Sequence, residues 1–383
     1  MRTILLSLIL IVMLVTSSTM ALEPPITATV PTTAPALTQE QVATAIEELG
    51  GTVEMEGNPP NWSVVGVGFG LNKAVSDSGL EPLKGLKQLR TLMVRDGINL
   101  TDAGVEHLKG LTQLQSLDLN DAKLTDVGMG YLEEMKKLLY LNLSGTKVTD
   151  VGLKHLKGFI QLQVLFLNMT DVSDAGLENL KGLNQLHELG LFSTKVTNAG
   201  LERIKGLNKL QTLTLAGTTV SDAGLEHLKG LERLNSLSLA GTKVGDAGLE
   251  HLKGLNGLQT LDLAGTKVTD MGMDQLKGLS QLQYLCLSDT KVTDAGIEHL
   301  KGLKKLQFLE LQNTIVTDAG LVHLKGMNQL RQLLLLHTSV TDAGLEHLKG
   351  LAQLQYLDLH DTKVTAQGVK KLKEALPKCN IKD

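Results

Sequence analysis

The sequence predicts an α/β solenoid, a right-handed horseshoe with a parallel sheet on its concave face and short helices on its convex face. The first observation is a block of 24 residues that recurs about twelve times in the 383-residue chain. A fixed period of this length is typical of solenoids, in which each unit buries its apolar face against its neighbours. The second is the pattern within a block, which opens L-x-x-L-x-L and closes G-L-x-x-L-K-G-L. The copies start at Leu89, Leu114, Leu138, Leu162, Leu186, Leu210, Leu234, Leu258, Leu282, Leu306, Leu330 and Leu354.

The first 37 residues are expected to lie outside this array. A basic residue, Arg2, precedes a short apolar run and a small-residue cleavage site after Ala21, which predicts a signal peptide at 1–21. The run is short for a bilayer span, and an uncleaved anchor is the alternative. Residues 22–37 are rich in Pro and Thr and predict an extended linker. We therefore expect an exported protein, periplasmic, cell-surface or secreted, without a stable membrane span.

Residues 38–88 predict an N-terminal cap and a degenerate first repeat. The segment from Thr38 to Gln41 matches a capping box that opens a helix through Leu49. Two strands around a turn are expected at 52–56 and 63–69. A solenoid needs such a cap because its first unit otherwise exposes core side chains.

About twelve repeats are predicted over 89–376, followed by a tail at 377–383. The alternation in L-x-x-L-x-L predicts a short strand with buried leucines. A threonine at the ninth position is expected to hydrogen-bond the backbone that leaves the strand. The aspartate of V-T-D-A-G-L is expected to N-cap a short helix. The closing glycine, as in Gly254 or Gly302, is expected to be left-handed.

The repeat resembles that of leucine-rich-repeat proteins over about residues 64–379. Its T-D-A-G-L segment is similar to the cysteine-containing subclass known from F-box-associated substrate receptors, with Thr where that subclass carries Cys. The signal peptide and the 24-residue unit resemble exported bacterial members more closely. The resemblance implies a horseshoe fold and a non-catalytic binding role. By analogy with the subclass, it also implies a ubiquitin-ligase-like substrate receptor as a less favoured alternative.

The composition argues against several classes of function. A formal net charge of −4 and a pI near 6.2 provide no basic face for nucleic acid. Cys286 and Cys379 lie about four repeats apart, which predicts free thiols rather than a disulfide. No paired carboxylate, Ser/His/Asp grouping or Cys/His cluster stands out from the period. Neither an enzyme, nor a metal site, nor a cofactor is predicted.

Two polar columns follow the period on the predicted helical side. A lysine column is preceded in most copies by an acid three residues earlier, which predicts ion pairs within each helix. A histidine column allows a metal-binding or pH-sensing hypothesis, against the simpler one of a solvated column copied with the repeat. We favour a solvated surface for both columns. The histidines are His107, His155, His227, His251, His299, His323 and His347.

Aromatic residues on the predicted strands break the period. The third, fifth and seventh positions of each repeat should face the concave side, and six of the ten aromatic residues lie there. With nearby apolar residues they form two groups, about 19 Å apart for strands spaced ~4.8 Å, across a floor of small side chains. The first group is Tyr140, Val164, Phe166 and Phe192; the second is Tyr284, Phe308, Leu334, Leu336 and Tyr356; the acids of this face are Asp118, Glu188, Asp262, Glu310 and Asp358.

These groups predict a monomeric, non-catalytic module that binds a protein or peptide ligand on its concave face, because exposed aromatic and apolar side chains mark interfaces. The mildly acidic face favours a ligand with basic residues. A different interpretation is that aromatic residues simply favour strands. The alternative functions are an envelope structural or spacer protein and a carbohydrate-binding protein whose Tyr and Phe side chains stack on sugar rings.

Overall fold

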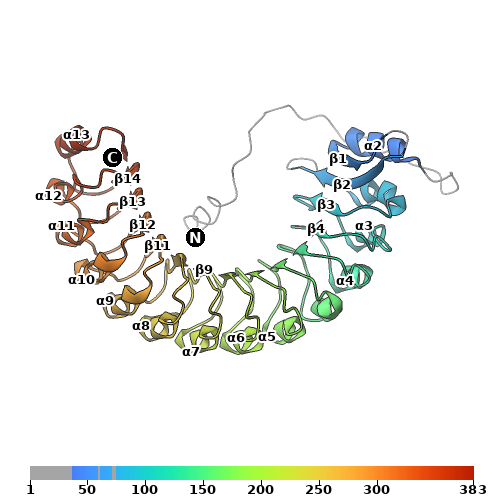
Figure 1. Ribbon diagram of the computed structural model, residues 1–383, viewed down its shortest axis with the longest axis horizontal. Coiled ribbons are helices and arrows are strands. Elements are labelled where there is room, and N and C mark those ends of the chain that lie inside the picture. The colour runs from blue at the N-terminus through green and yellow to red at the C-terminus, as the bar shows by residue number, and fades with distance from the viewer. Residues whose placement is uncertain (1–36, 59–60, 71–74) are drawn as a thin grey trace.

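The computed structural model describes residues 37–58, 61–70 and 75–383 (Figure 1). The predicted signal peptide and all but the last residue of the predicted linker lie outside these ranges. The described chain forms an open arc, with strands along its inner side and helices along its outer side. This is the horseshoe that the period predicts.

The N-terminal cap has the predicted elements. Helix α2 (Gln39–Glu48) begins at Thr38, whose side chain accepts a hydrogen bond from the Gln41 N–H while the Gln41 side chain accepts one from the Thr38 N–H. Strand β1 (Gly51–Glu56) follows and pairs antiparallel with β2 (Ser63–Phe69). Strand β2 then pairs in parallel with the first strand of the repeats, so the cap and the repeats share one sheet.

One sheet of 15 strands runs through the described residues in chain order, and every pair after β1–β2 is parallel. Equivalent residues of successive repeats lie side by side; Leu261, for example, is in register with Leu285. The last strand lies in the segment predicted as a C-terminal tail. The strands after β2 are β3 (Thr91–Val94), β4 (Ser116–Asp118), β5 (Tyr140–Asn142), β6 (Val164–Phe166), β7 (Glu188–Gly190), β8 (Thr212–Thr214), β9 (Ser236–Ser238), β10 (Thr260–Asp262), β11 (Tyr284–Cys286), β12 (Phe308–Glu310), β13 (Gln332–Leu334), β14 (Tyr356–Asp358) and β15 (Asn380–Lys382).

The helices of the outer side are short and often continue as a 3₁₀ turn. The α-helices are α3 (Asp102–Glu106), α4 (Asp126–Leu132), α5 (Asp174–Leu177), α6 (Asn198–Ile204), α7 (Asp222–Leu225), α8 (Asp246–Leu249), α9 (Asp270–Met273), α10 (Asp294–Glu298), α11 (Asp318–Leu321), α12 (Asp342–Leu345) and α13 (Ala366–Ala375). The 3₁₀ segments are η1 (Asp77–Gly85), η2 (Gly152–Gly158), η3 (Glu178–Leu180), η4 (Glu226–Leu228), η5 (Glu250–Leu252), η6 (Asp274–Gly278), η7 (His299–Gly302) and η8 (Val322–Leu324).

The repeat leucines and the ninth-position threonines behave as predicted. One continuous core of buried leucines and valines runs between the strands and the helices of the described chain. The Thr242 hydroxyl is buried and donates to the Leu239 carbonyl at 2.7 Å, and the equivalent threonines make the same bond. This bond satisfies both the buried hydroxyl and a carbonyl that leaves the strand.

The predicted N-cap role of the repeat aspartate is wrong. The residue before the aspartate occupies the N-cap, as Thr269 does for α9, where its hydroxyl accepts from the Met271 N–H. The aspartate reaches the next repeat instead: Asp246 accepts the Thr269 N–H and the Thr269 hydroxyl, both at 2.7 Å. A carboxylate can accept both bonds at once, so it joins each helix start to the one before it.

The closing glycine is left-handed in only some repeats. Gly110 and Gly326 have φ of 81° and 80°, as predicted, whereas Gly254 and Gly302 lack a positive φ. The eighth residue of every repeat is left-handed, with φ between 53° and 71°. The eighth residues are Asp96, Asp121, Gly145, Met169, Ser193, Gly217, Gly241, Gly265, Asp289, Asn313, His337 and Asp361.

Candidate binding surface on the concave face

The strands present one set of side chains to the core and another to the inside of the arc. In β12, the central Leu309 is fully buried, whereas Phe308 and Glu310 on either side are half-buried and point to the opposite face. The same pattern holds in β5, β6 and β13, because side chains alternate between the two faces of a sheet. In β4, β7, β10 and β11 the third residue is buried as well. The predicted site residues of positions three and five therefore lie on the concave face.

The N-terminal patch consists of Tyr140, Val164, Phe166 and Phe192. The rings of Tyr140 and Phe166 meet edge to face, with centroids 5.9 Å apart and an interplanar angle of 76°. Phe166 also lies over Gly190 of the next repeat, where an added Cβ would stand 2.7 Å from its Cδ1. Burial raises the pKa of the Tyr140 phenol to about 12. The patch is thus packed along the floor of the sheet and is half-exposed rather than fully solvated.

Met169 enlarges this region and was missed by sequence reasoning. It is the eighth residue of the repeat that contains Phe166, has φ of 55° and is 52% exposed. Its N–H donates to the carbonyl of Phe192 at 2.7 Å. A large apolar residue in the left-handed region is uncommon. The glycines at this position in four other repeats are the signal from which the unusual backbone could have been recognised.

The C-terminal patch consists of Tyr284, Phe308, Leu334, Leu336 and Tyr356. The rings of Tyr284 and Phe308 lie 6.4 Å apart with a 41° tilt. The Tyr284 hydroxyl donates to the Glu310 carboxylate at 2.8 Å. Burial raises the pKa of the Tyr284 phenol, so this group stays a hydrogen-bond donor at neutral pH.

A row of polar side chains crosses the sheet beside the C-terminal patch. Register places Asp262, Cys286 and Glu310 next to one another on β10, β11 and β12. The Cys286 thiol is 1% exposed and donates to Glu310 at 3.4 Å, or to the Ser288 hydroxyl at 3.3 Å. Burial raises the pKa of both carboxyls and of the thiol. Sequence reasoning did not include Cys286, although its fifth position in the repeat between two acids could have indicated it.

The other predicted acids differ in exposure. Asp118, like Asp262, is only 7% exposed, and burial raises its pKa. Glu188 is half-buried, and burial raises its pKa as well. Asp358 lies at the C-terminal end, where its Oδ1 is 2.6 Å from Nδ1 of His360. Most of the acidic side chains predicted on this face are therefore buried or half-buried in the sheet surface rather than fully exposed.

Small residues separate the two patches, as predicted. Strands β8, β9 and β10 carry hydroxyl and methyl side chains on the concave face, and most of these are half-buried. No large side chain interrupts this stretch of the floor. The residues are Thr212, Thr214, Ala216, Ser236, Ser238, Ala240, Thr260 and Ala264.

Comparison with known families agrees with this geometry. The family described as leucine rich repeat matches residues 87–148, 112–172, 232–292 and 256–316. The chain is a leucine-rich-repeat protein.

Solved structures of other leucine-rich-repeat proteins have the same fold. An internalin from Listeria monocytogenes is 22% identical, with a TM-score of 0.66 over 91% of this chain and 89% of that chain. A leucine-rich-repeat protein from Leptospira interrogans is 19% identical, with a TM-score of 0.52 over 82% of this chain and 95% of that one. No curated protein sequence matches the chain. These likenesses concern the fold alone.

The lysine column of this leucine-rich-repeat protein forms the predicted ion pairs on the outer side. Lys301 Nζ lies 2.8 Å from Glu298, and Lys349 Nζ lies 2.6 Å from Glu346. All of these side chains are more than one-third exposed, so solvent screens these pairs and they add little to stability.

The histidine column is less solvated than predicted. All seven histidines are half-buried, because the helices of adjacent repeats stand close enough to cover part of each ring. Nδ1 of His107, His251, His299 and His323 is buried without a hydrogen-bond partner. Burial lowers the pKa of His107. Among the described residues, no group of three or more His, Cys, Asp and Glu side chains is arranged to hold a metal ion.

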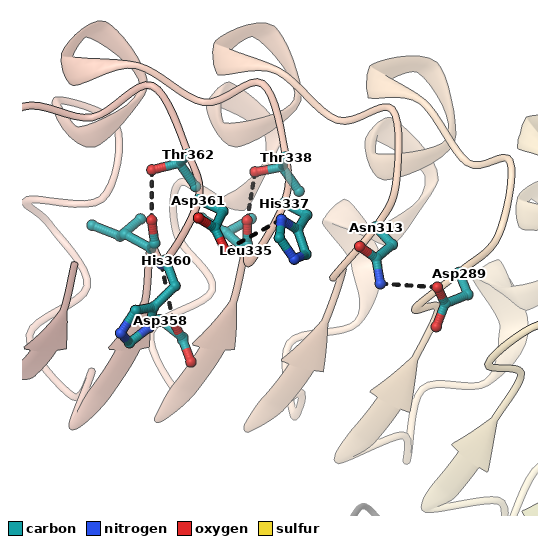
Figure 2. Close-up of polar contacts among 10 residues, drawn as sticks. Asp289, Asn313, Leu335, His337, Thr338, Asp358, His360, Asp361 and Thr362 are labelled. Carbon is teal, nitrogen blue, oxygen red and sulfur yellow. Dashed lines mark hydrogen bonds and ion pairs between the residues drawn. The ribbon is translucent and has the colours of Figure 1, made fainter. Parts of the chain in front are cut away.

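A polar rim borders the C-terminal patch of the leucine-rich-repeat sheet. Figure 2 shows its side chains on the loops that follow the strands. Asn313 donates to Asp289 at 2.9 Å, and His337 Nδ1 lies 3.5 Å from Asp361. These four residues are the left-handed eighth residues of the last four repeats. Where Gly217, Gly241 and Gly265 occupy this position in the central repeats, the rim has no side chains.

Two further observations concern the described part of the chain. None of its helices is both long and apolar enough to cross a membrane. Cys286 and Cys379 are free, as predicted, and both are buried.

Proposed function

We propose that this leucine-rich-repeat protein is a non-catalytic interaction module that binds a protein or peptide ligand across the N-terminal and C-terminal patches. The main support for this proposal is that these apolar and aromatic side chains depart from an otherwise regular repeat and lie together on one face. Leucine-rich-repeat proteins are typically non-enzymatic interaction modules. A half-exposed aromatic side chain contributes most to binding when a partner completes its burial.

The mechanism is rigid presentation of side chains. Strands in register and the buried threonine ladder hold the two patches at a fixed separation, so little conformational entropy is lost when a ligand binds. The small residues of β8 to β10 leave room for the backbone of a ligand that joins the patches. We propose that the binding unit is a monomer.

We further propose that the protein is exported to the periplasm, the cell surface or the medium. The support is the predicted signal peptide at residues 1–21. Recovery of protein that begins at Leu22 from an extracytoplasmic fraction is the expected result. Full-length chain confined to the cytoplasm would contradict the proposal.

The test of binding is a quantitative pull-down with three proteins. The first is the wild type, and the second carries Phe166→Ala, Phe192→Ala and Phe308→Ala. The third is a control in which exposed apolar residues on the helical side are removed by Val127→Ala, Val151→Ala and Met271→Ala. We expect the concave variant to lose at least tenfold in capture of a protein or peptide, and the control to lose none.

Unchanged capture by the concave variant, with an unfolding temperature equal to that of the wild type, would overturn the proposal. The same three proteins on a glycan array separate a carbohydrate ligand from a peptide. Glycan binding that depends on Phe166, Phe192 and Phe308 would replace the proposed ligand class with a carbohydrate.

A further inference from the structure

The row of Asp262, Cys286 and Glu310 has too few hydrogen-bond donors for its two carboxylates. Asp262 accepts the Ser238 hydroxyl at 2.9 Å and the Ala264 N–H at 3.1 Å. Glu310 accepts the Tyr284 hydroxyl at 2.8 Å, and the Gln312 side chain is also close enough to donate to it. The Cys286 thiol carries a single proton and can donate to only one acceptor at a time. Since each carboxylate has about four acceptor positions, both keep unfilled positions.

No cationic side chain in the described part of the chain makes an ion pair with either carboxylate. Asp262 is 7% exposed and Glu310 is half-buried, and burial raises the pKa of both. An unpaired carboxylate in a partly dry site is costly. A cation delivered from outside would remove this cost and fill the free acceptor positions.

Aromatic rings stand next to the row. Tyr284 is on the same strand as Cys286, and Phe308 is on the same strand as Glu310. The two rings lie 6.4 Å apart. An aromatic face attracts a guanidinium by cation–π interaction and by stacking. Carboxylates and rings together therefore suit a planar cation better than an apolar group or an anion.

We infer that Asp262, Cys286 and Glu310, with Tyr284 and Phe308 beside them, form a subsite for one arginine side chain of the ligand. A guanidinium has five donors in a planar fork and can serve two carboxylates at once. It approaches the two acids from the concave side, and its plane stacks against the rings. The subsite specifies that the protein or peptide ligand of the proposed function carries a positive charge at this point. The inference therefore rests on that function.

The sheet geometry also sets where this arginine lies in the ligand. Four strand spacings separate the repeat of Phe192 from that of Cys286, about 19 Å at ~4.8 Å each. An extended peptide spans this distance with roughly six residues. An apolar anchor on the N-terminal patch and an arginine in the subsite are therefore about six residues apart in an extended ligand.

The test uses a defined probe and needs no natural ligand. N-acetyl-arginine amide is titrated into the full chain and followed by NMR of labelled Tyr and Phe rings, beside N-acetyl-citrulline amide, which has the same shape without the charge. We expect the arginine probe to shift the Tyr284 and Phe308 signals and to bind at least tenfold more tightly than the citrulline probe. Equal binding of the two probes, or binding of neither, would overturn the inference.

Conservative variants locate the probe on the protein. Asp262→Asn and Glu310→Gln keep the side-chain shapes, and each is expected to weaken arginine binding at least tenfold. Glu232→Gln, at an exposed acid outside the concave face, is expected to have no effect. Undiminished binding to the Asp262→Asn, Glu310→Gln double variant would also overturn the inference.

The two proposals fail in distinguishable ways. If the concave face captures a partner but the arginine probe does not bind, the subsite is wrong and the binding function stands. If the probe binds as expected but Phe166→Ala, Phe192→Ala and Phe308→Ala leave partner capture unchanged, the arginine subsite exists without the proposed two-patch function.

Discussion

At the scale of residues, Asp262 places a carboxyl in the proposed binding surface at a cost in folding stability. Its carboxyl is buried in the sheet, and burial raises its pKa above the ordinary aspartate value of about 3.9. The folded state therefore binds this proton more tightly than the unfolded state. The resulting stabilisation is complete below about pH 3.9 and is lost as the pH rises through the folded pKa.

Because the raised pKa of Asp262 lowers stability at neutral pH, we predict that Asp262→Asn stabilises the protein there. An asparagine can accept from the Ala264 N–H and donate to the Ser238 hydroxyl, so the existing contacts persist without the desolvated charge. We expect thermal unfolding at pH 7 to show a higher Tm for the variant, with the difference narrowing towards pH 4. A variant that is less stable at pH 7, or a difference independent of pH, would contradict this account.

The side chain that joins successive helix starts is an aspartate in most repeats. In the fifth repeat an asparagine does the same work: Asn198 accepts the Ser221 N–H at 2.8 Å and donates to the Ser221 hydroxyl at 2.9 Å. The position thus requires an acceptor and a short side chain rather than a charge. A capping rule applied within one repeat could not predict this, because the partner lies 23 residues away.

At the scale of elements, the glycine of T-D-A-G-L is explained by the same contact. In α9, a Cβ at Gly272 would stand 2.5 Å from the Asp246 carboxylate and 3.1 Å from the Asp246 Cα. At Gly278, which ends the same helical segment, a Cβ would meet nothing within 4 Å. Two glycines of one repeat therefore have different physical roles.

The two glycines provide a matched pair of substitutions. We expect Gly272→Ala to lower the free energy of unfolding by ~1–3 kcal/mol because the carboxylate and backbone of the previous repeat must move. Gly278→Ala, at a site without positive φ, should be neutral or stabilising by up to ~1 kcal/mol. Urea unfolding of both variants measures the difference, and equal effects would show that the contact between repeats does not determine the glycine.

The sequence predicted the elements better than their contacts. Period and alternation located the strands, the threonine ladder and the face that carries Phe166 and Tyr284. The burial of Asp118 and Asp262 and the part played by Cys286 were not foreseen, because they depend on neighbours one repeat away in the sheet. The left-handed eighth residue was missed because glycine fills it in only some repeats.

At the scale of the whole molecule, the repeats act as spacers between the two patches. Each repeat packs mainly on its neighbours, so removal of one complete unit leaves equivalent junctions. Deletion of residues 210–233 removes the β8 repeat and brings the patches closer by ~4.8 Å. Deletion of residues 114–137 removes the β4 repeat, outside the span, and leaves their separation unchanged.

We expect the deletion of 210–233 to weaken capture of a ligand that bridges both patches at least tenfold, because one anchor no longer reaches its patch. The deletion of 114–137 should retain capture. Affinities measured for both proteins, after circular dichroism shows cooperative unfolding of each, test the spacing. Equal loss in both deletions, or none in either, would show that the distance between the patches is not recognised.

The central claim is that one ligand contacts both patches of the concave face. Site-specific photocrosslinking measures this directly, with a benzophenone amino acid placed at Phe192, at Tyr284 or, as a control, at Val151 on the helical side. The account predicts that the same ligand crosslinks from Phe192 and from Tyr284 through different segments, and not from Val151. Crosslinks from Val151 alone, or different molecules captured at Phe192 and Tyr284, would contradict it.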